Sequence, residues 1–377
     1  MVLALVSLGI CAVGLFGEDS RHTFLQSYLF GFTTWAGIAF GCLGFTLLHH
    51  TIRGAWGLSV LRIFEAGGSW LIFAIFGLLA LPLLFGGGLH DLYHWSHPEE
   101  VAKDHVLQLK TWWLNEGFFI ARTLIYFVVF GFVAAYLRKL SLTEDETRDQ
   151  KLGAKRTTIS APMLILFVVF TTFAATDWTM SLDPHWFSSM YGIIYMVGNG
   201  LAAMSLAVIL LLRNREKAPY REVVLPGLTK DLGNLIFVFT LLWSYTSLSQ
   251  FLIIYMGNIA EFTPFYVDRG KPVWNEISLF LLFGHFMAPF IILLSPKVKA
   301  VPSLLMGVAI WQFVVHFVEQ YWNTIPFMRK EFAFSVWDIA ALVLFGSIWF
   351  AVFSRQVQIG ALIPKHDPRL KEAYEHA

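Results

Sequence analysis

The chain has 377 residues, of which 56% are hydrophobic and only 14% are charged, whereas about 25% of the residues of a soluble globular domain are charged. A soluble protein is therefore not expected, and the length suffices for about ten membrane-spanning helices of about 20 residues each. The 27 Lys and Arg residues nearly balance the 26 Asp and Glu residues, so no overall basic charge favours nucleic acid. The two cysteines, Cys11 and Cys42, exclude a disulfide scaffold, a CxxC zinc site, an iron–sulfur cluster held by thiolates and a CxxCH haem attachment.

Apolar stretches bounded by charged residues, Gly or Pro predict ten transmembrane helices. In chain order they cover about residues 2–17, 24–48, 68–89, 116–137, 161–181, 190–212, 232–256, 274–295, 301–323 and 334–354. The first stretch is short, but no Lys or Arg precedes it and no small-x-small cleavage site follows, so we interpret it as a span and not a signal peptide. Because backbone groups find no water in a bilayer, the spans must be helices, and the predicted fold class is an all-α polytopic membrane protein.

Small residues recur in the second and sixth predicted spans, which run in the same direction. They let helices approach one another closely, and they are Gly31, Gly37, Gly41 and Gly44 in the second span and Gly192, Gly198 and Gly200 in the sixth. The pattern suggests two related four-helix units within a single membrane domain, 1–377. These units would be 24–181 and 190–323, with flanking helices at 2–17 and 334–354 and a tail at 355–377.

The distribution of Lys and Arg predicts the orientation. Of the 27 such residues, 19 lie in one alternate set of loops together with the C-terminal tail, 7 lie in the other set, and one lies inside a span. Because cytoplasmic loops carry an excess of positive charge, we expect both termini in the cytoplasm. The His- and Trp-rich loop 90–115 then lies on the outer face.

Ionisable side chains inside predicted spans are candidates for function, because burying them in hydrocarbon costs several kcal/mol unless they are paired or hydrated. Arg122 is the one cation inside a span, where it either pairs or snorkels to the outer interface. Asp177 lies at the outer end of the fifth span, deep enough for a buried partner to be expected. Asp338, one turn into the tenth span, is expected to interact with the helix dipole.

The ninth span carries a polar stripe. Gln312, His316, Glu319 and Gln320 are spaced i, i+4, i+7 and i+8, which places them on one helix face. We expect that face to point into the bundle. A His close to a Glu forms a pair with tunable pKa values that suits a proton relay, although a hydrogen-bonded clamp between helices has the same pattern.

A further histidine, His285, lies near the middle of the eighth span, four residues before Pro289, which cannot donate to its carbonyl. The opened carbonyl is a candidate hydration point, although a simple kink with a structural His gives the same pattern. His285 and His316 lie at different expected depths, so a haem held between them is not expected. Towards the cytoplasm Glu65 is expected to point inward, while most of the other ionisable residues are expected on solvated helix ends; these are His49, His50, Arg53, Arg62 and Asp231. We predict a proton path with Arg122, Asp177, His285, His316 and Glu319 towards the outer side and Glu65 towards the cytoplasm.

One sequence string resembles a known motif. The run Asp177-Trp178-Thr179-Met180-Ser181-Leu182-Asp183-Pro184-His185-Trp186, continued by Phe187-Ser188-Ser189-Met190-Tyr191-Gly192, resembles one in the polysulfide-reductase-type (NrfD/PsrC-like) membrane subunits of bacterial alternative complex III. The ten spans, the cytoplasmic termini and the segment from Asn115 to Arg122 fit the same family. By its length the chain is more similar to the smaller, F-type subunit than to the larger, quinol-binding one.

The resemblance implies two four-helix bundles with two flanking helices, in a bacterial inner membrane. It implies partners: a homologous larger ten-helix subunit that binds quinol, an iron–sulfur subunit, c-type haem subunits and small membrane anchors, besides the lipid bilayer. The complex oxidises menaquinol or another quinol, while the smaller subunit holds no cofactor, is not itself catalytic and is proposed to translocate protons. Three alternatives stay open: a quinol pocket in this chain lined by Trp178, Trp186 and His316, a stand-alone secondary transporter, and a structural scaffold.

Overall fold

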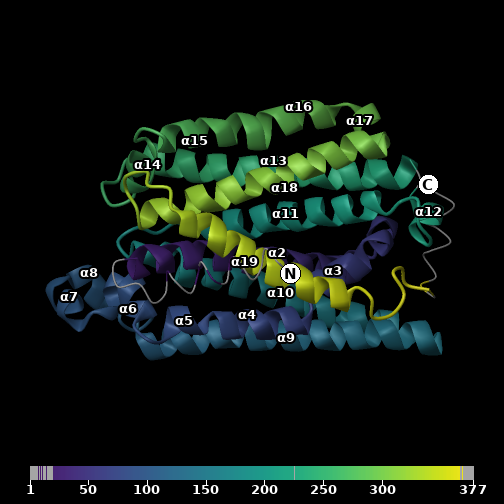
Figure 1. Ribbon diagram of the computed structural model, residues 1–377, viewed down its shortest axis with the longest axis horizontal. Helices are drawn as coiled ribbons and strands as arrows, with labels where there is room; N and C mark the ends of the chain where they lie inside the picture. Colours follow the sequence, from purple (N-terminus) through teal and green to yellow (C-terminus); the bar gives the residue numbers. More distant parts are fainter. Residues whose placement is uncertain are drawn as a thin grey trace.

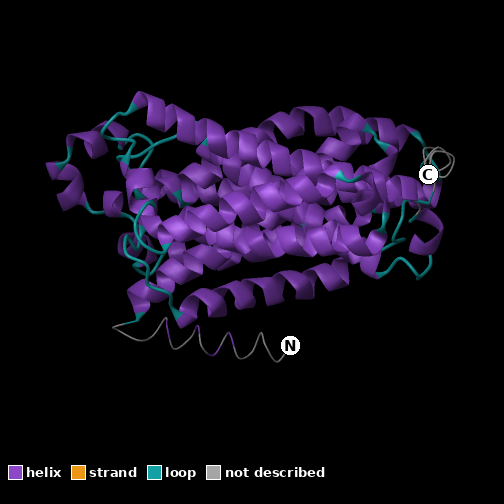
Figure 2. Cartoon of the chain, turned by 90° about the horizontal axis from the view of Figure 1, so that it is seen from above, coloured by secondary structure: helices purple, strands orange, loops and turns teal. Residues whose placement is uncertain are grey.

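The computed structural model describes residues 20–224 and 226–365 and the isolated positions 7, 9, 11, 14 and 367. Within these residues every regular element is a helix, and nine helical segments are long and apolar enough to cross a membrane. They lie side by side along the long axis of the molecule (Figures 1 and 2). The protein is therefore an all-helical polytopic membrane protein, as its composition predicts. The predicted first span, 2–17, lies outside the described residues except for four single positions.

The nine segments match the remaining nine predicted spans in order. They are α2 (Arg21–Ile52); α3, α4 and α5 (Leu61–Gly67, Trp70–Leu79 and Leu81–Leu84); α9 (Glu116–Thr147); α10 with η3 (Lys151–Trp178 and Met180–Leu182); α11 (Tyr191–Arg213); α13 (Pro226–Gly257); α15, η4 and α16 (Trp274–Phe280, Leu281–Met287 and Ala288–Leu294); α18 with η5 (Pro302–Thr324 and Ile325–Phe327); and α19 (Val336–Gln356).

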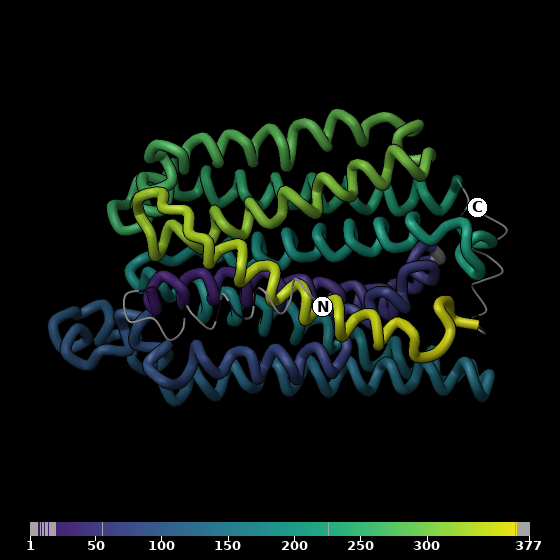
Figure 3. Tube along the Cα trace, viewed as in Figure 1, coloured from purple at the N-terminus to yellow at the C-terminus, as the bar shows by residue number. Residues whose placement is uncertain are grey.

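Short helices lie at the two ends of the bundle. One end, here named the long-loop end, consists of 85–115, 183–190, 258–273 and 328–335 and carries α6 (Gly88–Leu92), η2 (His94–Ser96), α7 (Pro98–Lys103), α8 (His105–Lys110) and α14 (Pro264–Arg269). The opposite end, named the tail end, consists of 53–60, 148–150, 214–224, 295–301 and 357–365 and carries η1 (Ala55–Ser59), α12 (Tyr220–Val223) and α17 (Pro296–Ala300). Figure 3 shows the chain passing back and forth between these ends.

Helices α9 and α10 extend further towards the tail end than the apolar pattern predicts. One predicted span ends at 137 and the next begins at 161, whereas α9 continues to Thr147 and α10 begins at Lys151. Their extensions are held together by a buried ion pair between Glu144 of α9 and Arg156 of α10. Because the two charges neutralise one another, both helices can extend beyond the apolar residues on which the prediction is based.

Helix α2 forms the centre of the bundle. It packs against α10, α11, α18 and α19, and every residue from Phe24 to Leu43 is buried. Its glycines permit the close contact with α11 that the sequence suggests. A Cβ atom at Gly37 would lie 2.2 Å from Asn199 Oδ1, and one at Gly41 would lie 2.5 Å from the Asn199 carbonyl oxygen.

Candidate functional site

The polar stripe of α18 forms a buried cluster with α13 and η4, named here the Glu319 cluster. Glu319 Oε2 lies 2.8 Å from His316 Nδ1 and 3.6 Å from His285 Nε2. Trp243 of α13 donates its indole N–H to Glu319 Oε1 at 2.6 Å. All three ionisable side chains are at most 1% exposed, so the prediction that this face points into the bundle is confirmed.

The α11 backbone approaches the carboxylate of this cluster closely. A Cβ atom at Gly198 would lie 2.5 Å from Glu319 Oε1, so only glycine leaves room for the carboxylate there. The next residue, Asn199, places its Oδ1 atom 3.2 Å from His316 Nε2 and donates from Nδ2 to the Tyr195 carbonyl. Both ring nitrogens of His316 thus have hydrogen-bond partners. The ring is therefore held between Glu319 of its own helix and Asn199 of α11.

His285 lies in a π-helical turn, Leu281–Met287. Such turns leave backbone groups without their usual helical partners, and here side chains of α18 supply the donors. Gln312 Nε2 donates to the His285 carbonyl at 3.2 Å, and Trp311 Nε1 donates to the Gly284 carbonyl at 2.6 Å. The His285 carbonyl, the predicted hydration point, is therefore occupied by a glutamine amide. The π-turn, which Pro289 follows closely, directs the imidazole towards Glu319.

Arg122 and Asp177 form a second buried cluster near the long-loop end, between α9 and α10. Arg122 donates to both carboxylate oxygens at 2.9 Å, and Tyr126 and Trp113 add further hydrogen bonds at 2.7 and 3.0 Å. The guanidinium also lies over the rings of Trp113 and Phe118, at 4.1 and 4.2 Å from their centroids. Arg122 is therefore paired and does not snorkel, and Asp177 has the buried partner that was expected. With four donors on one carboxylate, this cluster has the geometry of a fixed clamp.

The three residues of the alternative quinol pocket lie in different surroundings. Trp178 stacks on Phe127 and donates to Thr123 Oγ1 at 3.2 Å, whereas Trp186 stacks on Phe265 of α14. His316 lies in the Glu319 cluster. Both indoles are buried in aromatic packing, and each of the three residues belongs to a separate set of contacts.

Glu65 lies in a third buried cluster, towards the tail end. Arg62 Nη1 donates to Glu65 Oε2 at 2.8 Å, Arg138 of α9 binds the same oxygen, and His50 Nε2 lies 4.0 Å from Oε1. The expectation of solvated helix ends is wrong for His49, His50 and Arg62, which are at most 2% exposed. The reason is that α3 carries Arg62 into the bundle, where Ser141 and Asp145 of α9 also accept its hydrogen bonds. Arg53 is exposed.

Two buried arginines near the long-loop end were not singled out from the sequence. Arg329, counted there as a loop cation, pairs with Asp338 at 2.9 Å and donates to Ser27 of α2 at 2.9 Å. Asp338 also completes a capping box with Ser335, and the three-residue spacing of Ser335 and Asp338 was the only available signal. Asp338 is thus a capping and ion-pair residue, and more than a dipole partner.

The second of these arginines is Arg269 in α14. Its guanidinium lies 3.6 Å from the centroid of the Phe265 ring and donates to the carbonyls of Phe265, Trp322 and Asn323. Burial lowers the pKa of Arg269 to about 10, a value at which the side chain is still charged at pH 7. Arg269 therefore ties the loop between α13 and α15 to the end of α18.

The structure thus brings the predicted residues together in three groups. His285, His316 and Glu319 share one group, Arg122 and Asp177 share another, and Glu65 forms the third with arginines. Among the described side chains no hydrogen bond or ion pair connects one group with another. In the described part of the chain no set of three or more His, Cys, Asp or Glu side chains has a metal-binding arrangement.

Comparison of the chain with protein-family models and with curated proteins found no match.

Proposed function

We propose that the chain is a membrane subunit of a quinol-oxidising electron-transfer complex, similar to the smaller NrfD/PsrC-like subunit of alternative complex III. In this proposal it lies in a bacterial inner membrane with both termini in the cytoplasm. Its ten helices form two four-helix units, 24–181 and 190–323, and two flanking helices. The quinol is oxidised in a homologous neighbouring subunit, and iron–sulfur and c-type haem subunits carry the electrons. This chain provides a path for protons.

The observation that carries the proposal is the Glu319 cluster. A carboxylate that shares two histidines inside a bundle can accept a proton from one protonated ring, which leaves both groups neutral, and then release that proton to the other ring, which restores a pair of opposite charges. Ionisable groups at membrane depth are costly, and substrate, ion and proton paths are among the roles that they mark. Glu319 is the exchanging group in this proposal, and His285 and His316 are its two proton partners.

The other two groups have different roles in the proposed path. Glu65, with His50 at 4.0 Å, contributes to the path from the cytoplasmic side. The Arg122–Asp177 pair holds the outer ends of α9 and α10 together and borders the path, because four hydrogen bonds fix the Asp177 carboxylate in place.

The test uses the complex that co-purifies with the chain in mild detergent, reconstituted into vesicles with quinol and an electron acceptor. The proposal requires haem- and iron–sulfur-bearing subunits among the co-purifying proteins. It further requires Glu319→Gln to lower the number of protons translocated per electron while quinol oxidation continues. The matched control is Glu276→Gln, which changes an exposed carboxylate on α15. A Glu319→Gln complex with an unchanged ratio overturns the proton path.

A second candidate, a stand-alone secondary transporter, is favoured by one observation. Transporter sites are commonly built at interrupted helices near the middle of the membrane, and the π-helical turn Leu281–Met287 interrupts a span beside the buried Glu319. The two candidates differ in assembly. A chain that purifies alone and moves a solute in vesicles is a transporter, whereas a chain that purifies with redox subunits is not.

A further inference from the structure

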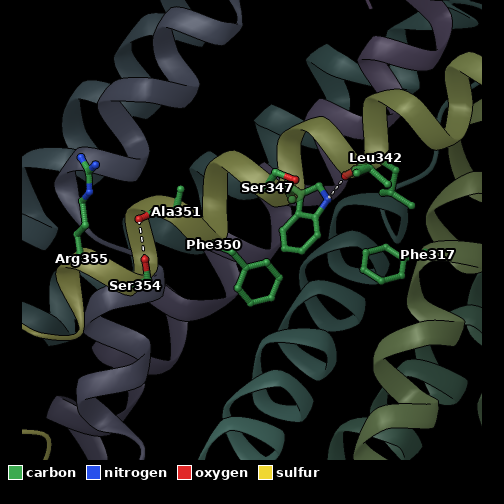
Figure 4. A pocket seen from close by; sticks show the side chains of 10 residues that line it. Phe317, Leu342, Ser347, Phe350, Ala351, Ser354 and Arg355 are labelled. Carbon is green, nitrogen blue, oxygen red and sulfur yellow. Dashed lines mark hydrogen bonds between the residues drawn. The ribbon is translucent and has the colours of Figure 1, made fainter. Parts of the chain in front are cut away.

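A groove of about 740 Å³ lies along α19, on the side where this helix meets α2 and α18. Figure 4 shows the lining side chains following α19 from Leu342 to Ser354 and Arg355 at the tail end, with Phe317 of α18 beside Leu342. At 1.5 Å per residue the helix rises by about 20 Å over this stretch. This length is close to half the thickness of a bilayer, which measures about 40 Å with its headgroups.

The membrane-buried part of the groove is apolar and preformed. Its inner end is closed by Trp35 of α2, whose indole N–H donates to the Leu342 carbonyl at 2.9 Å. The Trp35 ring lies against the α19 backbone because residue 346 is a glycine, where a Cβ atom would lie 2.5 Å from the ring. The rings of Phe317 and Phe350 pack on Trp35 with centroid distances of 5.8 and 5.6 Å.

The positive charge of the groove lies at its tail end. The Ser354 hydroxyl is used within the helix, since it donates to the Ala351 carbonyl at 2.9 Å. Arg355 lies in the last turn of α19 and is exposed, and in the described ranges no carboxylate forms an ion pair with it. The groove therefore combines an apolar channel of one-leaflet length with a single positive charge at the membrane surface.

We propose that this groove binds one anionic phospholipid from the leaflet at the tail end. Its phosphate lies on Arg355, and one acyl chain follows α19 past Phe350 to the Trp35 ring. A lipid fits better than a further protein helix, because the groove combines an apolar stretch of one-leaflet length with one charge at its end, as an acyl chain and its headgroup require. The positive charge favours an anionic over a zwitterionic headgroup.

The first test measures lipid retention by the purified full-length protein. The protein is exchanged into vesicles of phosphatidylcholine containing a minor fraction of phosphatidylglycerol, extracted gently, and analysed by native mass spectrometry. We expect one retained phosphatidylglycerol per chain. Arg355→Gln should lower its preference over phosphatidylcholine about fivefold, the factor that corresponds to one basic residue at a membrane surface. Lys297→Gln, which removes an exposed cation at the same end of the bundle, should leave the preference unchanged.

A second variant keeps the proposal falsifiable if the charge alone has little effect. Ala351→Trp places a large side chain in the groove at an exposed position of α19, and it should abolish retention of either lipid. The proposal is overturned if the wild-type protein retains no phosphatidylglycerol, or if Arg355→Gln and Ala351→Trp both retain it like wild type.

The third measurement identifies the occupant directly. A photo-crosslinking residue in place of Val343, which lines the groove, should form an adduct with the mass of a phospholipid. An adduct with a peptide overturns the proposal, whether the peptide comes from residues 2–17 of this chain or from a co-purifying protein.

Discussion

Replacing Asp177 by Asn tests whether the Arg122–Asp177 cluster is a fixed clamp. The Asp177 carboxylate is fully buried and accepts hydrogen bonds from Arg122, Tyr126 and Trp113. An asparagine offers one oxygen in place of two, and its NH2 group faces donors. The Arg122 charge then stays buried without a counter-charge, a change that costs about 3–5 kcal/mol in proteins. Because the Trp113 carbonyl and two aromatic rings still contact the guanidinium, we expect the lower value, about 3 kcal/mol.

The assay is reversible unfolding of the purified chain in mixed micelles, followed by circular dichroism as the fraction of denaturing detergent rises. Asp183→Asn, at a half-buried position six residues further on, is the control and should change the free energy of unfolding by less than about 0.5 kcal/mol. The double variant Arg122→Gln with Asp177→Asn should recover at least 1 kcal/mol relative to the sum of the single changes. A loss below 1 kcal/mol for Asp177→Asn refutes the clamp.

The remaining predictions concern a glycine, a buried ion pair and an exposed one. Gly198→Ala should displace the carboxylate of the Glu319 cluster, because the added Cβ would lie 2.5 Å from it, and should lower the free energy of unfolding by about 1–3 kcal/mol in the same assay. Gly307→Ala, with open space around its Cβ, should not lower it. Arg329→Gln should lower the free energy of unfolding by about 3 kcal/mol, since the capping carboxylate of α19 loses its ion-pair partner; an unchanged midpoint of detergent unfolding contradicts this. Desolvation alone raises the pKa of Asp104, but the hydrogen bonds from His185 and from the first turn of α8 outweigh it and lower the pKa. The stabilisation by this carboxylate is therefore present above the usual aspartate pKa of about 3.9 and is lost as the pH falls through the lower folded-state value. Hydrogen exchange in 183–190 should rise in that acidic range in wild type, and already at pH 7 in Asp104→Asn.

The spans could be predicted because hydropathy alone specifies them. Nine of the predicted stretches coincide with helices of the structure, since any apolar stretch of this length must be helical in a bilayer. Their ends could not be predicted equally well. At the tail end, Glu144 and Arg156 neutralise one another between two helices, and a prediction that stops at the first charged residue cannot anticipate such a pair.

The candidate site could be predicted only where its residues share a helix. The spacing of His316 and Glu319 identifies them as neighbours on one face, and the structure places them 2.8 Å apart. The partners from other helices carry no such signal. Arg329 is 302 positions from the Ser27 hydroxyl to which it donates, and Trp243 is 76 positions from Glu319. These pairs depend on how the helices assemble, which single-sequence periodicity does not contain.

The burial of α2 has a consequence for biogenesis. This helix leaves the ribosome early, but the helices that cover it are synthesised much later. Asp338, which accepts a hydrogen bond from the Ser27 side chain, follows it by 311 positions in the chain. During synthesis α2 must therefore remain in contact with lipid or with the insertion machinery until α11, α18 and finally α19 are translated. Chains truncated before α19 leave Trp35 and Gly31 of α2 uncovered, which makes them natural substrates for membrane quality control.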